Sequence, residues 1–229
     1  MTRLRVVAAG ALALVTGAAH PVAVAFQDDH TWTTDFESER AQLTSSGRNP
    51  YFVLETGYQL RLADATDTLV ISVMPTTKVV DGVETRIVEE RESSRGKLVE
   101  VSRNFFAISK RTNSVYYFGE EVDMYRDGRI ASHEGAWLAG VKGAKFGLMM
   151  PGLPLVGGKY YQEMAPGAAM DRAEIIATSE TVRVPTGEFH NVLRTLESSA
   201  LESGKEPKLY GREVGLLQEG NLKLVKYGK

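Results

Sequence analysis

Cysteine is absent from the 229 residues, and this absence removes several kinds of chemistry at once. Without thiols the chain has no disulfides, no thiolate ligands for zinc or iron–sulfur clusters and no cysteine nucleophile. Histidine is scarce, with four in the chain, and none has the spacing of a metal-binding His-Glu-x-x-His motif. Serine-nucleophile and phosphate-loop motifs are also missing. The sequence therefore argues against nucleotide-dependent chemistry and excludes many enzyme classes.

Long apolar runs are missing after the first residues. Arg3 and Arg5 precede an apolar stretch over residues 6–18, and Ala23-Val24-Ala25 fits a small-x-small cleavage pattern. We therefore predict a signal peptide over residues 1–25. Its removal takes two of the 27 basic residues and none of the 29 acidic ones, which leaves a formal net charge of −4.

This acidic balance disfavours a nucleic-acid partner. No later run approaches the roughly 20 apolar residues of a membrane-spanning helix. We expect a periplasmic or secreted protein with no transmembrane segment in its mature chain. Its partner would be an apolar or amphipathic small molecule, or another exported protein.

Residues 26–48 are polar and carry few large side chains, chiefly Trp32, Phe36 and Leu43. We expect an N-terminal strap with a short helix over residues 36–43. The single domain, residues 49–229, begins at Asn49-Pro50, because the residue before a proline is pushed into an extended conformation.

Short segments rich in β-branched and aromatic residues follow one another from this point. Asp81-Gly82, Arg95-Gly96 and Asp127-Gly128 are two-residue turns of the kind found in hairpins. Turn signals at this spacing predict an all-β fold, a strongly curved antiparallel sheet or incomplete β-barrel of about ten strands.

Residues 135–158 interrupt this pattern with glycines and with Pro151 and Pro154, which a continuous strand does not tolerate. The segment is nevertheless apolar, which argues against disorder. We expect it to be a Gly/Pro-rich loop that plugs or covers one end of the barrel.

Several short runs resemble a family of uncharacterised secreted bacterial proteins. They are Asn49-Pro50-Tyr51-Phe52, Val115-Tyr116-Tyr117-Phe118-Gly119-Glu120, Glu134-Gly135-Ala136-Trp137-Leu138-Ala139-Gly140-Val141, Met150-Pro151 and Tyr160-Tyr161-Gln162-Glu163. A broader set of exported β-proteins, including those shaped like the lipoprotein carrier LolA, is similar to the C-terminal pair of runs Val184-Pro185-Thr186-Gly187-Glu188-Phe189 and Tyr210-Gly211-Arg212-Glu213-Val214-Gly215-Leu216-Leu217. The resemblance implies a LolA-like β-barrel and export, and it implies no chemistry.

Candidate catalytic residues are few. His133 lies beside Glu134, and a histidine next to a carboxylate is able to act as a general base. Glu163 lies near Asp171, and two carboxylates on opposing elements would form an acid and base pair, as in glycoside hydrolysis. The alternative for these residues is an ordinary solvated strand surface.

Glu121 and Asp123 share one face of a predicted strand and would supply oxygen ligands to calcium, the one cofactor that the sequence suggests. The alternative is a charged outer face, since no EF-hand loop accompanies the pair. Aromatic and methionine side chains would line an apolar pocket at the barrel mouth. These candidate ligand-binding residues are Tyr116, Phe118, Trp137, Phe146, Met149, Met150 and Tyr160.

Two functions fit these patterns. The first is an exported, non-enzymatic binding protein for an apolar or amphipathic small molecule or a protein partner. The second is an exported hydrolase or lyase that uses carboxylates together with His133. The quantity of apolar loop material and the lack of a catalytic signature favour binding.

Overall fold

Antiparallel strands make up nearly all of the regular secondary structure in this computed structural model, which describes residues 32–229. The signal peptide predicted over residues 1–25 lies outside this range. A single 3₁₀ helix, η1 (Glu37–Gln42), occurs among the described residues, within the range where the sequence predicts a short helix. No helix in residues 32–229 has the length and apolar character needed to cross a membrane.

The strands in chain order are β1 (Leu43–Thr44), β2 (Gly47–Asn49), β3 (Phe52–Leu54), β4 (Gln59–Ala63), β5 (Asp67–Val80), β6 (Val83–Ser94), β7 (Lys97–Ser109), β8 (Val115–Arg126), β9 (Arg129–Ser132), β10 (Trp137–Leu138), β11 (Lys145–Met150), β12 (Lys159–Tyr161), β13 (Glu163–Met164), β14 (Asp171–Val184), β15 (Gly187–Ser199), β16 (Glu206–Gly211), β17 (Gly215–Glu219) and β18 (Leu222–Gly228).

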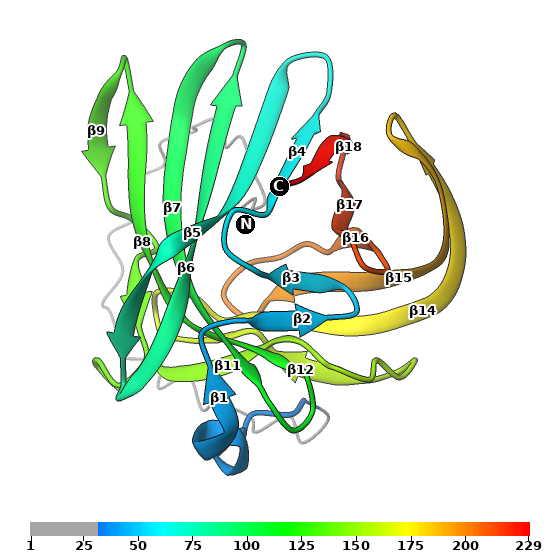
Figure 1. Cartoon of the computed structure of the whole chain (residues 1–229). Coiled ribbons are helices and arrows are strands. Elements are labelled where there is room, and N and C mark those ends of the chain that lie inside the picture. Colours follow the sequence, from blue (N-terminus) through cyan, green and yellow to red (C-terminus); the bar gives the residue numbers. More distant parts are fainter. Residues whose placement is uncertain (1–31) are drawn as a thin grey trace, which may run out of the picture.

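Thirteen of these strands follow one another in a single hydrogen-bonded order, β12-β14-β15-β16-β17-β18-β4-β5-β6-β7-β8-β11-β13. The sheet curves round into a nearly closed barrel (Figure 1). The all-β, barrel-like prediction is confirmed, but the number of strands exceeds the predicted ten. Interruptions of the chain add to the number: Gln162 separates β12 from β13, and a turn at Gly220 (φ 54°) separates β17 from β18.

Residues 159–164 bring the two ends of this order together. β12 pairs with β14 at one end, β13 pairs with β11 at the other, and only Gln162 separates them. The Gln162 N–H also donates to the Asp171 carbonyl at 2.8 Å. Gly147 permits this approach, because a Cβ at that position would lie 2.3 Å from the Gln162 carbonyl oxygen. We call residues 159–164 the seam.

The predicted hairpin turns are present. Asp81, Arg95 and Asp127 have φ values of 47°, 50° and 52°, and each precedes a glycine that also has a positive φ. Two successive residues with positive φ match the right-handed twist of the flanking strands. The first two turns therefore join the long hairpins β5 to β6 and β6 to β7, and the third joins β8 to the short strand β9.

The segment over residues 135–158 differs from the predicted plug or lid, because part of it joins the sheet. β10 and β11 both pair with β8, and Gly140 and Gly143, with φ values of 80° and 79°, turn the chain between them. Backbone groups in a packed segment need hydrogen-bond partners, and the β8 edge supplies them. The remaining part carries exposed Leu153, Leu155 and Val156.

The β2–β3 hairpin fills the barrel interior instead (Figure 1). Val53 and Leu54 are buried, and the Phe52 ring lies 5.0 Å from that of Phe106 on β7. The buried Asn49 side chain anchors the hairpin, donating from Nδ2 to the carbonyls of Asn113 at 2.8 Å and Pro151 at 3.0 Å. The hairpin, rather than residues 135–158, therefore plugs the barrel interior.

Candidate functional site

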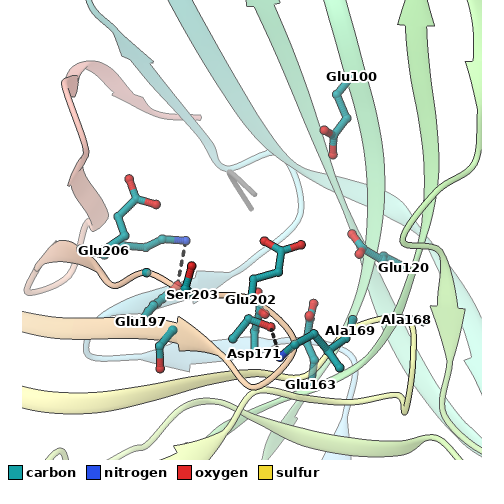
Figure 2. A pocket seen from close by; sticks show the side chains of 15 residues that line it. Glu100, Glu120, Glu163, Ala168, Ala169, Asp171, Glu197, Glu202, Ser203 and Glu206 are labelled. Atoms are coloured by element: carbon teal, nitrogen blue, oxygen red, sulfur yellow. Dashed lines mark hydrogen bonds and ion pairs between the residues drawn. The ribbon is translucent and has the colours of Figure 1, made fainter. Parts of the chain in front are cut away.

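A cavity of about 90 Å³ lies inside the barrel and reaches the surface at the connection between β15 and β16 (Figure 2). Glu100 and Glu120 stand on β7 and β8, and Figure 2 shows them across the cavity from Asp171 and Glu197. We call it the acidic cavity. Its lining residues that bear charge are Glu100, Glu120, Glu163, Asp171, Glu197, Glu202, Glu206 and Lys208.

Strand alternation explains why carboxylates enter the interior, since successive side chains point to opposite faces of a sheet. On β8, Glu120 is buried and lines the cavity, whereas the next residue, Glu121, is half exposed and pairs with Lys78. On β7, Asn104 is buried inside while Arg103 faces outward and pairs with Asp123 at 3.1 Å. The interior therefore has a polar band along β7 and β8.

Lys208 is a cation enclosed within this acidic interior. Its Nζ lies 2.9 Å from Glu197 Oε2 and 3.0 Å from Glu219 Oε1, and all three side chains are at most 13% exposed. Burial alone would lower the pKa of Lys208, but the two carboxylates outweigh it and hold that pKa well above its usual value. Lys208 therefore stays charged and pairs with both Glu197 and Glu219.

Several carboxylates in or near the cavity resist ionisation. Burial raises the pKa of Asp171, and the nearby Glu197 raises it further. Burial and then Glu219 raise the pKa of Glu206 in the same way. Burial raises the pKa of Glu92 to about 7, reinforced by Glu100. Each shift shows that negative charge in this region is costly.

A second cavity, of about 60 Å³, lies beside the β2–β3 hairpin, and we call it the apolar cavity. Lys208 belongs to the lining of both cavities, so the two meet at that residue. Its apolar walls come from β3 to β7, the β3–β4 turn, β11, and β16 to β17: Phe52, Val53, Tyr58, Leu60, Ile71, Val73, Val88, Phe106, Met149, Tyr210, Val214 and Leu216.

The Gln162 side chain contacts one residue of each cavity. Its Nε2 lies 3.2 Å from Glu197 Oε1 in the acidic cavity and 3.6 Å from Met149 Sδ in the apolar one. The residue is 1% exposed, and its Oε1 has no hydrogen-bond partner among the described residues. The hydroxyls of Tyr160 and Thr195 are also buried and lack partners within residues 32–229. Buried polar atoms of this kind are rare in proteins and call for an explanation.

The predicted ligand-binding residues are all buried, but of these Met149 alone lines either of the two cavities. Tyr116, Phe118 and Phe146 pack together, with the Phe118 and Phe146 rings stacked at 4.6 Å. The N-terminal strap covers them, since Phe36 lies 5.8 Å from Tyr116 and the Arg40 guanidinium 4.9 Å from Phe146.

The other candidates are core residues. The Trp137 ring meets Tyr117 edge-on at 5.4 Å, and Met150 is 1% exposed. Tyr160 packs inside, where burial raises its pKa far above the usual value. These aromatic and methionine residues fill the core.

The predicted catalytic residues do not come together. His133 has a side chain that is 67% exposed, with Nδ1 3.0 Å from Asp123 Oδ1 and 2.8 Å from the Val122 carbonyl. Glu134 is exposed, whereas Glu163 is buried and lines the acidic cavity. The histidine therefore lies outside the barrel and Glu163 inside it.

The predicted calcium ligands face protein cations. Glu121 pairs with Lys78, and Asp123 pairs with Arg103 and His133. Within residues 32–229, no three histidine, aspartate or glutamate side chains are grouped closely enough to hold a metal ion. The carboxylates of the acidic cavity are likewise too widely spread to surround a single ion.

Sequence reasoning missed most of the residues that form the acidic cavity. Glu100, Glu120, Glu197 and Lys208 occupy alternate positions in strands whose register the sequence does not fix. One available signal was Lys208 itself, which stands in the short, otherwise apolar run Pro207-Lys208-Leu209-Tyr210.

No family model and no curated protein matches the chain. Among solved structures, the chain is similar to that of a "putative exported protein with YmcC-like fold" from Bacteroides fragilis, at 15% identity and a TM-score of 0.40. The match covers 80% of this chain and 100% of the other. A likeness this distant supports no inference about function, and the resemblance to LolA-shaped proteins stays a prediction.

Proposed function

We propose that this protein is an exported, non-enzymatic binding protein that takes a small amphipathic molecule into its barrel interior. The observation that carries the proposal is the meeting of an apolar and an acidic cavity at Lys208. Interiors of β-barrels are recurrent sites for apolar ligands, with a few polar groups that fix the orientation. Here the apolar part of the ligand lies against Val73 and Met149, and its polar end lies among the carboxylates.

The proposal of export rests on the predicted signal peptide, residues 1–25. Both cavities are smaller than the roughly 150 Å³ that holds benzene in an engineered protein core. A short ligand, or one that displaces part of the β2–β3 hairpin, therefore fits best.

The first test is native mass spectrometry of protein purified without detergent, with release and identification of anything bound. We expect one small amphipathic molecule per chain. The second test is titration with three six-carbon probes, hexylamine, hexan-1-ol and hexanoate. Val73→Phe would fill the apolar cavity and should weaken the binding of every probe that binds. Val79, on the same strand, is 68% exposed, so Val79→Phe should leave binding unchanged. An empty protein that binds none of the three probes would refute the proposal.

A second candidate is a hydrolase whose acid and base are Glu163 and Asp171, because both line one cavity and Asp171 has a raised pKa. Two carboxylates in unequal environments are the usual arrangement for glycoside hydrolysis. Release of product from a panel of glycosides, lost in Glu163→Gln, would favour this candidate over binding.

A further inference from the structure

We propose that one outer face of the barrel docks onto the surface of a membrane that contains anionic lipids. This docking face consists of an exposed apolar loop, residues 153–156, and of Trp32, Lys159, Arg172 and Ile176 beside it. The proposal concerns the outside of the molecule, so it does not depend on a ligand in the barrel interior.

The apolar loop carries three large side chains that the fold leaves in solvent. Leu153, Leu155 and Val156 are 77%, 65% and 64% exposed, and they lie within four consecutive residues. On the neighbouring strand β14, Ile176 is 38% exposed and extends the apolar surface. Exposed apolar groups that gather in this way are typical of a surface that meets a membrane or a partner.

Hydrogen bonds hold the apolar loop at both ends. The Gly152 N–H donates to Ser114 Oγ at 3.0 Å, and the Gly157 N–H donates to the Ile175 carbonyl at 2.8 Å. Pro154, within the loop, has no N–H and so adds no donor that would need water. A loop that is ordered before it binds loses little conformational entropy on binding. Its side chains are therefore presented ready to enter the interfacial layer of a bilayer.

Positive charge lies directly after the loop in the sequence and across the sheet from it. Lys159 on β12 and Arg172 on β14 lie over the Trp32 ring, at 5.7 Å and 4.5 Å from its centroid. Strand alternation turns both outward, because the next residue of each strand is buried. Arg172 bonds to the Ser198 hydroxyl at 3.4 Å and forms no ion pair within residues 32–229, whereas Lys159 lies 3.7 Å from Glu174. Two cations against one carboxylate, with a tryptophan between strand and solvent, suit the head groups of anionic lipids.

The chain also enters the described part of the structure at this face. The Thr33 N–H donates to the Lys159 carbonyl at 3.0 Å, and the Thr33 carbonyl accepts from the Tyr161 N–H at 3.0 Å. Residues 26–31 join this point to the predicted cleavage site at Ala25, and a chain of that length reaches at most about 25 Å. Until the predicted signal peptide is removed, the docking face is therefore held close to the membrane. This position favours a bilayer over a soluble partner.

The first test is flotation of the exported protein with two kinds of vesicle, pure phosphatidylcholine and an equal mixture of phosphatidylcholine and phosphatidylglycerol. We expect the mixed vesicles to bind at least about tenfold more tightly, and added sodium chloride to weaken this binding. Brominated lipid in the mixed vesicles should quench Trp32. The Trp32→Phe variant keeps only the buried Trp137, and it should lose this quenching.

Two matched pairs of variants test the docking face itself. Leu155→Ser should weaken binding to the mixed vesicles at least about fivefold, whereas Ile130→Ser, at a 50% exposed position of β9, should not. Arg172→Gln should weaken it about fivefold, whereas Arg129→Gln, also exposed on β9, should not. The control strand β9 lies away from β12 (Figure 1). Equal midpoints of urea unfolding in test and control variants confirm that the fold is kept.

Binding to neither kind of vesicle would overturn the proposal. In that case a dimer in analytical ultracentrifugation, dissociated by Leu155→Ser, would assign the apolar loop to a second copy of the chain instead. Equal binding to both vesicles, or equal losses in the test and control variants, would also overturn it, because neither result depends on the docking face. The six-carbon probes test binding in the barrel interior separately, so the two proposals fail independently.

Discussion

The Lys208 ammonium lies 3.0 Å from the Glu219 carboxylate, and both side chains are almost fully enclosed, at 6% and 2% exposure. A buried ion pair adds little net stability, but removing one partner strands the other charge in the interior. The two residues are therefore expected to tolerate separate substitution poorly.

Lys208→Met should lower the free energy of unfolding by about 3–5 kcal/mol at pH 7, because Glu197 and Glu219 would lose their shared cation. Urea unfolding followed by tryptophan fluorescence measures the change. Lys223→Met, at an exposed position, should have almost no effect. An equal loss in the two variants would show that the buried pair has no special role.

In the unsubstituted protein, the raised pKa of Lys208 determines how its contribution to stability changes with pH. A group whose folded pKa exceeds its unfolded value contributes its full stability below the unfolded pKa. That contribution is lost as the pH rises through the folded pKa. The stabilisation by Lys208 should therefore persist from neutral pH to about pH 10 and disappear only in strong alkali.

Glu92→Gln should stabilise the protein at pH 8 and have little effect at pH 4. Burial raises the folded pKa of Glu92 from 4.5 to about 7. Below pH 4.5 the carboxyl is protonated in both the folded and the unfolded chain, and it costs no stability. As the pH rises through about 7, the folded protein must bury a charged carboxylate and loses stability. The upper limit of the gain at pH 8 is about 3 kcal/mol, and partial solvent access reduces it. Urea unfolding from pH 4 to pH 8 checks this, and a pH-independent difference between the two proteins would contradict it.

Asn49→Ala should destabilise the β2–β3 hairpin by about 2–3 kcal/mol. The substitution leaves the carbonyls of Asn113 and Pro151 without the amide donor that reaches both, and it removes the oxygen that accepts from the Tyr51 N–H at 2.7 Å. Hydrogen exchange at the Tyr51 amide is the direct measurement. Unchanged protection of that amide would mean that other contacts hold the hairpin.

Gly147→Ala should weaken the seam. The added methyl group would lie 2.3 Å from the Gln162 carbonyl oxygen and 2.7 Å from that of Tyr161, so β11 must move away from the seam. We expect a loss of at least about 2 kcal/mol. Amides of residues 159–164 should exchange faster, while those of the β5–β6 hairpin serve as the internal reference. Uniform acceleration in both regions would indicate global destabilisation instead.

Local chemistry made part of this fold predictable from sequence. The turns at Asp81-Gly82 and Asp127-Gly128 need positive φ at both positions, and asparagine, aspartate and glycine tolerate this best. Hairpins around such turns follow from neighbouring residues alone. The short helix η1 was predictable for a similar reason, because its turns join residues that are close together in the sequence.

The interior of the barrel was not predictable in the same way. On β8 the sequence shows that Glu120 and Glu121 point in opposite directions, but not which of them faces inward, since apolar residues occupy both faces of the strand. The pairing of β7 with β8 is also irregular between Asn104 and Phe106, and this irregularity changes which side chains point into the barrel. The acidic cavity depends on such registers in six strands at once, so a single sequence does not reveal it.

The position of β18 between β17 and β4 also determines the order in which the barrel is able to assemble. The hairpins β5 to β8 and β14 to β17 each form from nearby residues, but β4 gains its second neighbour only when the last described strand is made. Contacts between such distant segments form slowly. Until then β4 and β17 both present unpaired backbone groups, which attract strands of other chains. A chain shortened before Leu222 is therefore expected to aggregate, and a chain still being synthesised passes through the same exposed state.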